Sequence, residues 1–299
     1  MDYQVWSNGE YVVRSEATIS MMDRGFRLGD VVFDTSRTFN GKIFRLHDHL
    51  DRLYRSLQYT RIDPGLSMDE MARLTLDVVE RNESMRESAK DDYMITQIVT
   101  RGTGTVQEPS SPGISIWIDP LNAPRYGPLQ KTGAHVVIPK TRSYSPEQID
   151  PKVKHYSRLN FVLAELEATD VDPDALPLLL DTNGNITEGI GSNFFMVSNG
   201  VLKTAKYNDI LQGVSRVTVL ELAKQLGIPA VEEDLQPYDV YTADEAFMSS
   251  TPYCILPVGR VDNRKLGEEV PGPITQQLLA AWSERVGLDI VDQLGRLAQ

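Results

Sequence analysis

One stretch in the middle of the chain decides the fold. Residues 151–164 read PKVKHYSRLNFVLA, and residues 178–195 read LLLDTNGNITEGIGSNFF. In the first segment, Lys154 ends an extended run and immediately precedes an amphipathic helix. In the second, an apolar strand passes through an Asn-Gly turn into a return strand that carries Glu188. A charged residue taken alone, such as Lys154 or Glu188, is most often a solvated surface residue. These two residues become informative only together with the motifs that accompany them.

The rest of the chain alternates strand and helix patterns, which predicts an α+β (mixed α/β) fold. Asn-Gly pairs at residues 8–9 and 40–41 mark hairpin turns. Leucines spaced three and four apart over residues 46–57 indicate a helix. The other expected helices cover residues 67–83, 156–169, 213–226 and 274–286, and the expected strands include residues 31–39, 93–100, 114–118, 135–139, 176–181, 186–188, 193–197, 245–249 and 254–258.

The length of the chain indicates two domains. A chain of 299 residues exceeds the usual size of one compact core. Residues 119–133 carry three Pro and two Gly without periodicity, which is typical of a linker. We therefore expect a small N-terminal α+β domain over residues 1–119, an interdomain loop over residues 120–133, and a larger C-terminal domain over residues 134–299 that contains Lys154.

Composition excludes several classes of protein. The chain has 30 Lys plus Arg against 42 Asp plus Glu, a net charge of −12, which disfavours nucleic-acid binding. The single cysteine, Cys254, allows no intrachain disulfide and favours a reducing compartment. No apolar run reaches membrane-spanning length, and from the residues at the N-terminus we expect no signal peptide. We expect a cytoplasmic protein that binds neither membrane nor nucleic acid.

Common catalytic and metal-binding motifs are missing from the sequence. The four histidines form no H-x₃-H or H-E-x-x-H pattern, and one cysteine cannot build a thiolate site. No G-x-S-x-G nucleophile motif and no GKS or GKT phosphate loop occurs. We therefore expect no metal site, and we expect chemistry other than that of a serine hydrolase or a phosphate-loop enzyme.

Five ordered motifs give the sequence its functional signal. They are the Lys154 segment, Thr187-Glu188-Gly189 followed by Asn193-Phe194, the run from Phe44 to Leu53 with His49 and Arg52, Leu211-Gln212-Gly213-Val214-Ser215-Arg216, and the segment from Asp244 to Thr251. Together they resemble the class IV aminotransferases, the fold-type IV enzymes that use pyridoxal 5′-phosphate. The resemblance covers nearly the whole chain and implies a two-lobed fold like that of D-amino acid aminotransferase.

The resemblance also implies roles around the cofactor. Lys154 would form the imine and, once released by substrate, would move the proton. Glu188 would keep the pyridine nitrogen protonated, so that the ring accepts electrons. The carboxylate and the amine would then lie at opposite ends of one ring. The remaining implied cofactor contacts are Arg52, Ser192, Asn193, Val214, Ser215 and Thr251.

Four branches of this family compete, and each is matched in part. Leu159 stands where the branched-chain aminotransferases usually carry a Tyr. Thr100-Arg101-Gly102 resembles the D-amino acid aminotransferases, but Val106 and Glu108 replace their carboxylate trap. The run from Ile149 to Lys154 resembles the (R)-selective amine transaminases, whereas Lys154-His155-Tyr156-Ser157-Arg158-Leu159 also fits the aminodeoxychorismate lyases.

From these features we predict a transaminase that moves an amino group from an (R)-amine or a D-amino acid to a keto acid such as pyruvate. The alternatives are an aminodeoxychorismate lyase, which eliminates pyruvate, and a branched-chain amino acid aminotransferase. By its resemblance to the family we expect a homodimer. The predicted substrate contacts are Phe33, Arg37, Tyr93, Arg125, Arg158 and Pro252.

Overall fold

The computed structural model describes residues 2–89, 91–108, 110–121 and 123–298. Strands and helices are mixed along the chain, which confirms the predicted α+β class. Backbone contacts divide the chain into two compact units. Unit 1 holds Met1–Leu121 and Val153–Arg158, and unit 2 holds Asn122–Lys152 and Leu159–Gln299.

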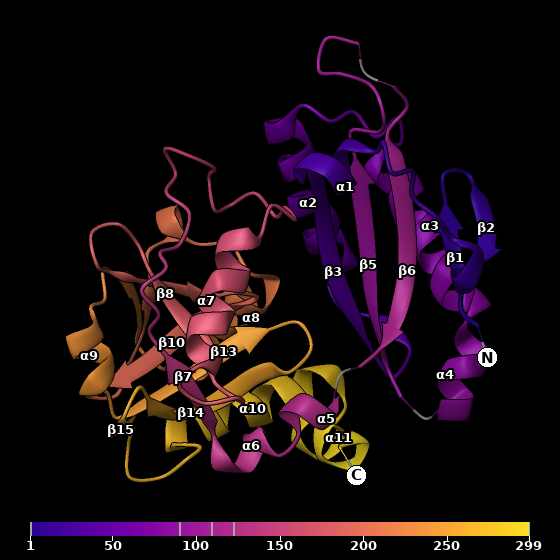
Figure 1. Ribbon diagram of the computed structural model, residues 1–299. Helices are drawn as coiled ribbons and strands as arrows, with labels where there is room; N and C mark the ends of the chain where they lie inside the picture. The colour runs from indigo at the N-terminus through magenta and orange to yellow at the C-terminus, as the bar shows by residue number, and fades with distance from the viewer. Residues whose placement is uncertain (1, 90, 109, 122, 299) are drawn as a thin grey trace. The chain divides into compact units, whose positions relative to one another are not determined.

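Unit 1 is built on one antiparallel sheet (Figure 1). Its strand order is β2-β1-β6-β5-β3-β4. The predicted Asn8-Gly9 turn joins β1 to β2, and both of its residues take the positive φ values that such a turn requires. The strands are β1 (Gln4–Ser7), β2 (Glu10–Val13), β3 (Val31–Phe39), β4 (Lys42–Ile43), β5 (Tyr93–Thr100) and β6 (Gly113–Pro120).

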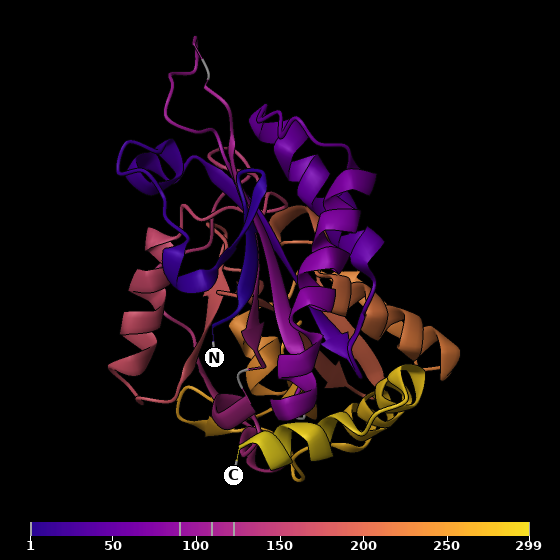
Figure 2. The same ribbon diagram turned by 90° about the vertical axis from the view of Figure 1, so that its right-hand side faces the viewer.

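Two long helices cover one face of this sheet (Figure 2). They are α2 (Leu46–Thr60) and α3 (Met68–Arg81). Apolar residues at helical spacing, such as Leu50 and Leu53 of α2, are fully buried against strand residues such as Val32 and Ile95. The shorter helical pieces of unit 1 are η1 (Arg14–Glu16), α1 (Arg24–Leu28) and α4 (Glu83–Ala89).

The short segment Val153–Arg158 pairs with the edge of β3, which places Lys154 in unit 1. The Phe33 amide donates to the Lys154 carbonyl at 3.0 Å, and the Tyr156 amide donates to the Val31 carbonyl at 3.4 Å. The sequence had placed Lys154 in the C-terminal domain. The difference arises because the segment completes its backbone hydrogen bonds on a strand that lies more than a hundred residues earlier.

Unit 2 contains a nine-stranded sheet in which β9 also pairs with β10, so that β10, β13, β14, β7, β8 and β9 form a closed ring. The pairs β7–β8, β7–β14 and β11–β12 are parallel. Its strands are β7 (Ala134–Val137), β8 (Leu176–Leu180), β9 (Ile186–Gly189), β10 (Ser192–Ser198), β11 (Val201–Ala205), β12 (Ala230–Glu233), β13 (Glu245–Ser250), β14 (Cys254–Val261) and β15 (Arg264–Lys265).

Helices surround this sheet. Among them, α8 (Val214–Gln225) and α10 (Pro273–Val286) pack on β13, as Figure 1 shows. The expected linker folds into two short helices, α5 (Ala123–Tyr126) and α6 (Leu129–Thr132). The other helical elements are α7 (Leu159–Thr169), η2 (Tyr207–Asp209), α9 (Pro237–Tyr241) and α11 (Ile290–Leu297). None of the helices among the described residues has the length and apolarity that a bilayer crossing demands.

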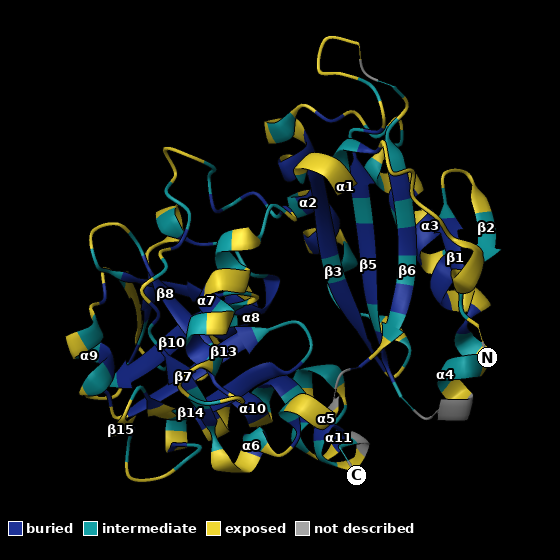
Figure 3. Cartoon of the chain, in the orientation of Figure 1, coloured by how far each residue is buried: buried dark blue, intermediate teal, exposed yellow. Residues whose placement is uncertain are grey.

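Helix α7 turns its large apolar side chains outward. Leu159, Val162, Leu163 and Leu166, at helical spacing, are between 48 and 73% exposed, whereas the small Ala164 and Ala168 are buried. Figure 3 shows the exposed positions along this helix. A helix with its bulky apolar residues on the outside has a face suited to covering by a partner.

Candidate active site

Lys154 is fixed at its backbone from two sides of unit 1. Its carbonyl accepts from Phe33, and its amide donates to the Ser56 hydroxyl of α2 at 3.2 Å. The side-chain nitrogen lies 4.6 Å from the centre of the Phe33 ring. The nearby Lys152 is bound differently, because its amine pairs with Asp150 at 3.0 Å. These contacts distinguish the two lysines of this segment.

A buried charge network lies on the helix side of β3, next to the Lys154 segment. The fully buried Asp34 carboxylate accepts from Nε and Nη2 of Arg52, each at 2.8 Å, and lies 2.7 Å from Nδ1 of His49. Burial opposes ionisation of Asp34, but the Arg52 guanidinium and His49 outweigh it and hold the pKa of this carboxyl well below its usual range. The network fixes the direction of the Arg52 side chain.

His49 in this network stays neutral near pH 7. Burial lowers the pKa of its imidazole, and the charges of Arg52 and Lys154 add to that effect against the opposing pull of Asp34. A neutral imidazole can donate to the Asp34 carboxylate from one ring nitrogen. The sequence motif around His49 and Arg52 was recognised, but their common partner Asp34 was not, because it lies on a separate strand.

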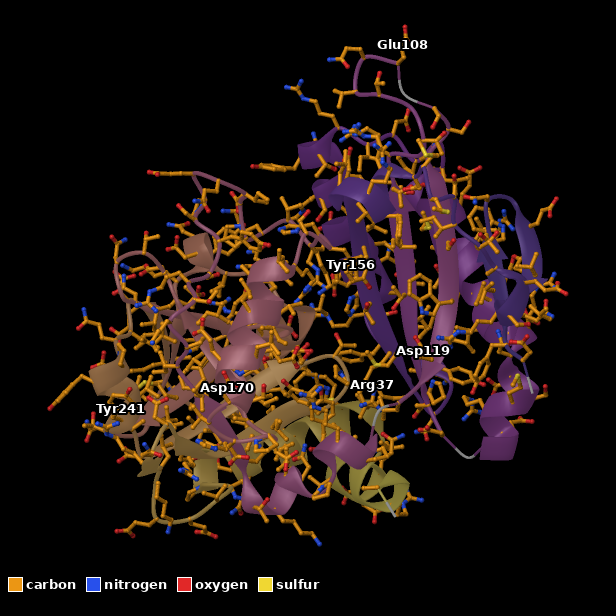
Figure 4. All side chains as sticks on the ribbon, in the orientation of Figure 1. Arg37, Glu108, Asp119, Tyr156, Asp170 and Tyr241 are labelled. Atoms are coloured by element: carbon orange, nitrogen blue, oxygen red, sulfur yellow. The ribbon has the colours of Figure 1, made fainter. Side chains whose placement is uncertain are left out.

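The Phe33 ring of β3 contacts three residues of the Lys154 segment. The Lys154 amine and the Arg158 guanidinium carbon lie 4.6 and 5.9 Å from the centre of this ring, whereas Val153 and His155 are buried. The Tyr156 ring stacks on the Phe33 ring with centres 3.7 Å apart and planes 7° apart. Figure 4 labels Tyr156 near β3. Sequence reasoning had assigned no role to this tyrosine.

Two other predicted substrate contacts of unit 1 differ in their surroundings. Arg37 follows Phe33 by four residues on the same face, is 2% exposed, and lies over the Phe39 ring at 3.9 Å. Tyr93 points into the core instead, where its hydroxyl donates to the Asn82 carbonyl at 2.8 Å. The alternation of β5 puts Tyr93 on the helix-covered face. The structure therefore does not support Tyr93 as a substrate contact.

In unit 2, Glu188 is a buried carboxylate held by neutral donors. It accepts from the Leu211 amide at 3.1 Å and from Nδ2 of Asn193 at 3.0 Å. Antiparallel pairing of β9 with β10 sets Glu188 directly opposite Asn193. The side chain of Asn193 also donates to the Leu211 carbonyl at 2.9 Å, so one amide ties both strands to the loop before α8.

The start of α8 comes within contact distance of the Asn193 side chain. A Cβ on Gly213 would lie 2.1 Å from Oδ1 of Asn193, so this approach requires glycine. The helix has no side-chain cap, which leaves the first amides, at Val214 and Ser215, available for an anion. On the strand opposite Asn193, the buried Ser249 hydroxyl has no hydrogen-bond partner among the described residues. This donor set fits a phosphate group.

Four further predicted positions lie in unit 2: two in a turn, one at the start of a strand and one in the short helix α5. Thr251 and Pro252 form the turn between β13 and β14, and Ser192 begins β10. Arg125 is 47% exposed at its side chain and lies 3.6 Å from Glu165 of α7. Within the described ranges, no cluster of three or more potential ligands could hold a metal ion.

The sequence matches a known protein family. Residues 31–261 match the family model described as amino-transferase class IV. A putative branched-chain-amino-acid aminotransferase of Methanocaldococcus jannaschii is 36% identical over 97% of this chain and 100% of its own length. The D-alanine aminotransferase of Listeria monocytogenes is 32% identical over 95% of this chain and 96% of its own length.

Solved structures agree with this result. The branched-chain aminotransferase of Thermoproteus uzoniensis with norvaline matches with a TM-score of 0.86 and 28% identity, over 96% of each chain. The Escherichia coli branched-chain amino acid aminotransferase matches with a TM-score of 0.85 and 28% identity, over 96% of this chain and 95% of that chain. Both similarities extend over nearly the full length, so the fold-type IV architecture expected from the sequence is confirmed.

Proposed function

The chain belongs to the class IV aminotransferases, whose cofactor is pyridoxal 5′-phosphate, and we propose that it moves the amino group between an apolar α-amino acid and a 2-keto acid. The cofactor supplies a carbonyl for the amino nitrogen and a ring that accepts electrons. The observation that carries the substrate class is on unit 1: the Lys154 amine and the Arg158 guanidinium lie over the same Phe33 ring, at 4.6 and 5.9 Å from its centre.

Local geometry supports a distinct role for each cofactor residue. Lys154 provides the amine that binds the cofactor, and its fixed backbone aims that amine over Phe33. Glu188 would accept a hydrogen bond from the protonated ring nitrogen, and two of its donors, the Leu211 amide and Nδ2 of Asn193, are neutral. The amides of Val214 and Ser215 and the hydroxyls of Ser215 and Thr251 suit the phosphate. Ser192, which precedes Asn193 on β10, is also proposed as a cofactor contact.

Arg52 is proposed as a charged partner of the phosphate, held ready by Asp34. A guanidinium carries five donors, and the two hydrogen bonds to Asp34 use donors on Nε and Nη2. The cost of ordering this long side chain is met when the protein folds rather than when the cofactor binds.

The proton transfer is assigned to Lys154. The Lys154 amine lies 4.6 Å from the centre of the Phe33 ring, and in its free form it would be placed to move the proton of the substrate. Arg158, with Arg37 further along the face, provides positive charge for the substrate carboxylate. An amino acid brings a carboxylate to this positive charge, so it fits better than an amine without a carboxylate.

Branched-chain amino acids are the donors that we propose first. The relative at 36% identity and both full-length structural matches carry that activity in their names. A D-amino acid, which the sequence predicted, is the second candidate, because the D-alanine aminotransferase of Listeria monocytogenes is 32% identical over nearly the whole chain. Arg125 and Pro252 remain proposed substrate contacts of unit 2.

The test is a donor panel with the purified, cofactor-loaded chain. L-leucine, L-valine, D-alanine and (R)-1-phenylethylamine are each offered with pyruvate or 2-ketoglutarate, and the keto products are quantified. Fastest turnover of L-leucine or L-valine supports the first proposal, and fastest turnover of D-alanine supports the second. A preference for (R)-1-phenylethylamine would reject the role of the carboxylate. Pyruvate release from aminodeoxychorismate without transamination would identify a lyase.

A second copy of the chain is the proposed partner. The exposed stripe Leu159, Val162, Leu163 and Leu166 on α7 is apolar and would cover its own counterpart across a two-fold axis. The single cysteine, buried at Cys254, agrees with the cytoplasmic location proposed from the sequence. Sedimentation equilibrium of the native chain tests the homodimer, and a monomer at micromolar concentration would reject it.

A further inference from the structure

Unit 1 carries an aromatic surface beside the reactive amine that the family motifs do not account for. Tyr156 lies two residues after Lys154 and two before Arg158, on a segment that forms a bridge to β3 at His155. All three side chains contact the Phe33 ring of β3. The neighbouring residues Val153 and His155 are buried.

Lys154, Tyr156 and Arg158 all lie close to the Phe33 ring. Its centre lies 4.6 Å from the Lys154 amine, 5.9 Å from the Arg158 guanidinium carbon, and 3.7 Å from the centre of the Tyr156 ring. The two aromatic planes are nearly parallel, at 7°. Phe33 is 6% exposed whereas Tyr156 is 39% exposed, so the tyrosine presents the outer surface of the pair.

Burial raises the pKa of the Tyr156 phenol, so the side chain is neutral throughout the working pH range. A neutral, flat and partly exposed ring is suited to contact with apolar groups. Stacking on Phe33 limits its rotation, which reduces the entropy lost when a ligand packs against it.

An α-amino acid has three groups on its central carbon: nitrogen, carboxylate and side chain. We propose that Tyr156 determines specificity by contacting the substrate side chain, while the nitrogen takes the place of the Lys154 amine and Arg158 binds the carboxylate. Three contacts, one for each group, fix both the size of the side chain and the hand of the substrate. The inference rests on the proposed function and adds a specificity residue to it.

The test compares two donors that differ in side-chain size. Leucine and alanine, in the hand that the wild-type chain accepts, are assayed for kcat/KM with wild type, Tyr156→Ala and Tyr156→Phe. Removal of the ring should lower the leucine-to-alanine ratio by roughly tenfold, the scale of a lost apolar contact in a binding pocket. Tyr156→Phe keeps the ring and should keep the ratio. Tyr59→Ala removes an exposed tyrosine of α2 and should change neither donor.

The ratio separates a specificity role from a structural one. A Tyr156→Ala variant that loses activity equally on both donors, or keeps the wild-type ratio, overturns the inference. If Tyr156→Ala fails to fold, Tyr156→Leu replaces it, and an unchanged ratio in that variant together with Tyr156→Phe also overturns the inference. A wild-type chain that transaminates no amino acid refutes the proposed function itself, whereas a working enzyme with an unaltered ratio refutes only the role of Tyr156.

Discussion

Replacing Asp34 by asparagine tests the buried network that holds Arg52. The variant keeps the shape of the side chain but removes its charge, and its amide nitrogen would face donors of Arg52 or His49. The Arg52 side chain is 11% exposed and regains little hydration. Breaking a buried pair by removing one charge costs roughly 3–5 kcal/mol, so we expect the free energy of unfolding to fall by about 3 kcal/mol at pH 7.

The stability difference between wild type and Asp34→Asn should depend on pH in a defined direction. The pKa of Asp34 is depressed in the folded chain, so its stabilising contribution is complete above the unfolded pKa of about 3.9 and is lost as the pH falls below that value. The asparagine variant lacks this contribution at every pH. The difference between wild type and variant should therefore be largest at neutral pH and should shrink below about pH 4.

Urea unfolding followed by tryptophan fluorescence provides the assay, with the cofactor-free chain at pH 7 and again near pH 3.5. Asp51→Asn is the matched control on α2, because Asp51 and its partner Arg55 are both more than half exposed. An exposed pair contributes at most about 1 kcal/mol. A loss in Asp34→Asn no larger than that of the control, or a difference that does not shrink in acid, would refute the reasoning.

Three further predictions concern unit 2. Glu188→Gln should retain bound cofactor and its visible colour but slow turnover by about a hundredfold, since it removes the charge beside the ring nitrogen; unchanged kcat in steady-state assays would reject the role. Gly213→Ala should destabilise the chain by roughly 1–3 kcal/mol and weaken cofactor binding in a fluorescence titration, because its Cβ would lie 2.1 Å from Asn193; wild-type affinity would contradict the close approach. Leu163→Asp should shift a dimer toward monomer in sedimentation, since it places charge in the exposed stripe of α7; an unaffected dimer would place the interface elsewhere.

Local patterns were sufficient to predict much of the fold. The Asn-Gly turns at residues 8–9 and 40–41 take left-handed backbone angles, and β5 has the predicted bounds. The helix expected from residue 213 begins at Val214, after a glycine that contacts Asn193. These features depend on neighbours in sequence, where turn chemistry and periodicity act directly.

Contacts between distant residues were not predictable from one chain. The pairing of the Lys154 segment with β3 and the contact of Asp34 with Arg52 depend on which strand lies next to which. The alternation of β5 alone did not say which of its faces α2 and α3 would cover, so Tyr93 was assigned to the substrate. The apolar stripe of α7 showed helical spacing, but sequence could not tell that it faces outward.

The most direct test of the account is to locate the covalent bond to the cofactor. The loaded protein is reduced with borohydride, which makes the lysine–cofactor bond permanent, and is then digested and analysed by fragmentation mass spectrometry. The account predicts the added mass on Lys154, with none on Lys152, whose amine pairs with Asp150. Modification of Lys152, or of no lysine in a protein that has bound the cofactor, would contradict it.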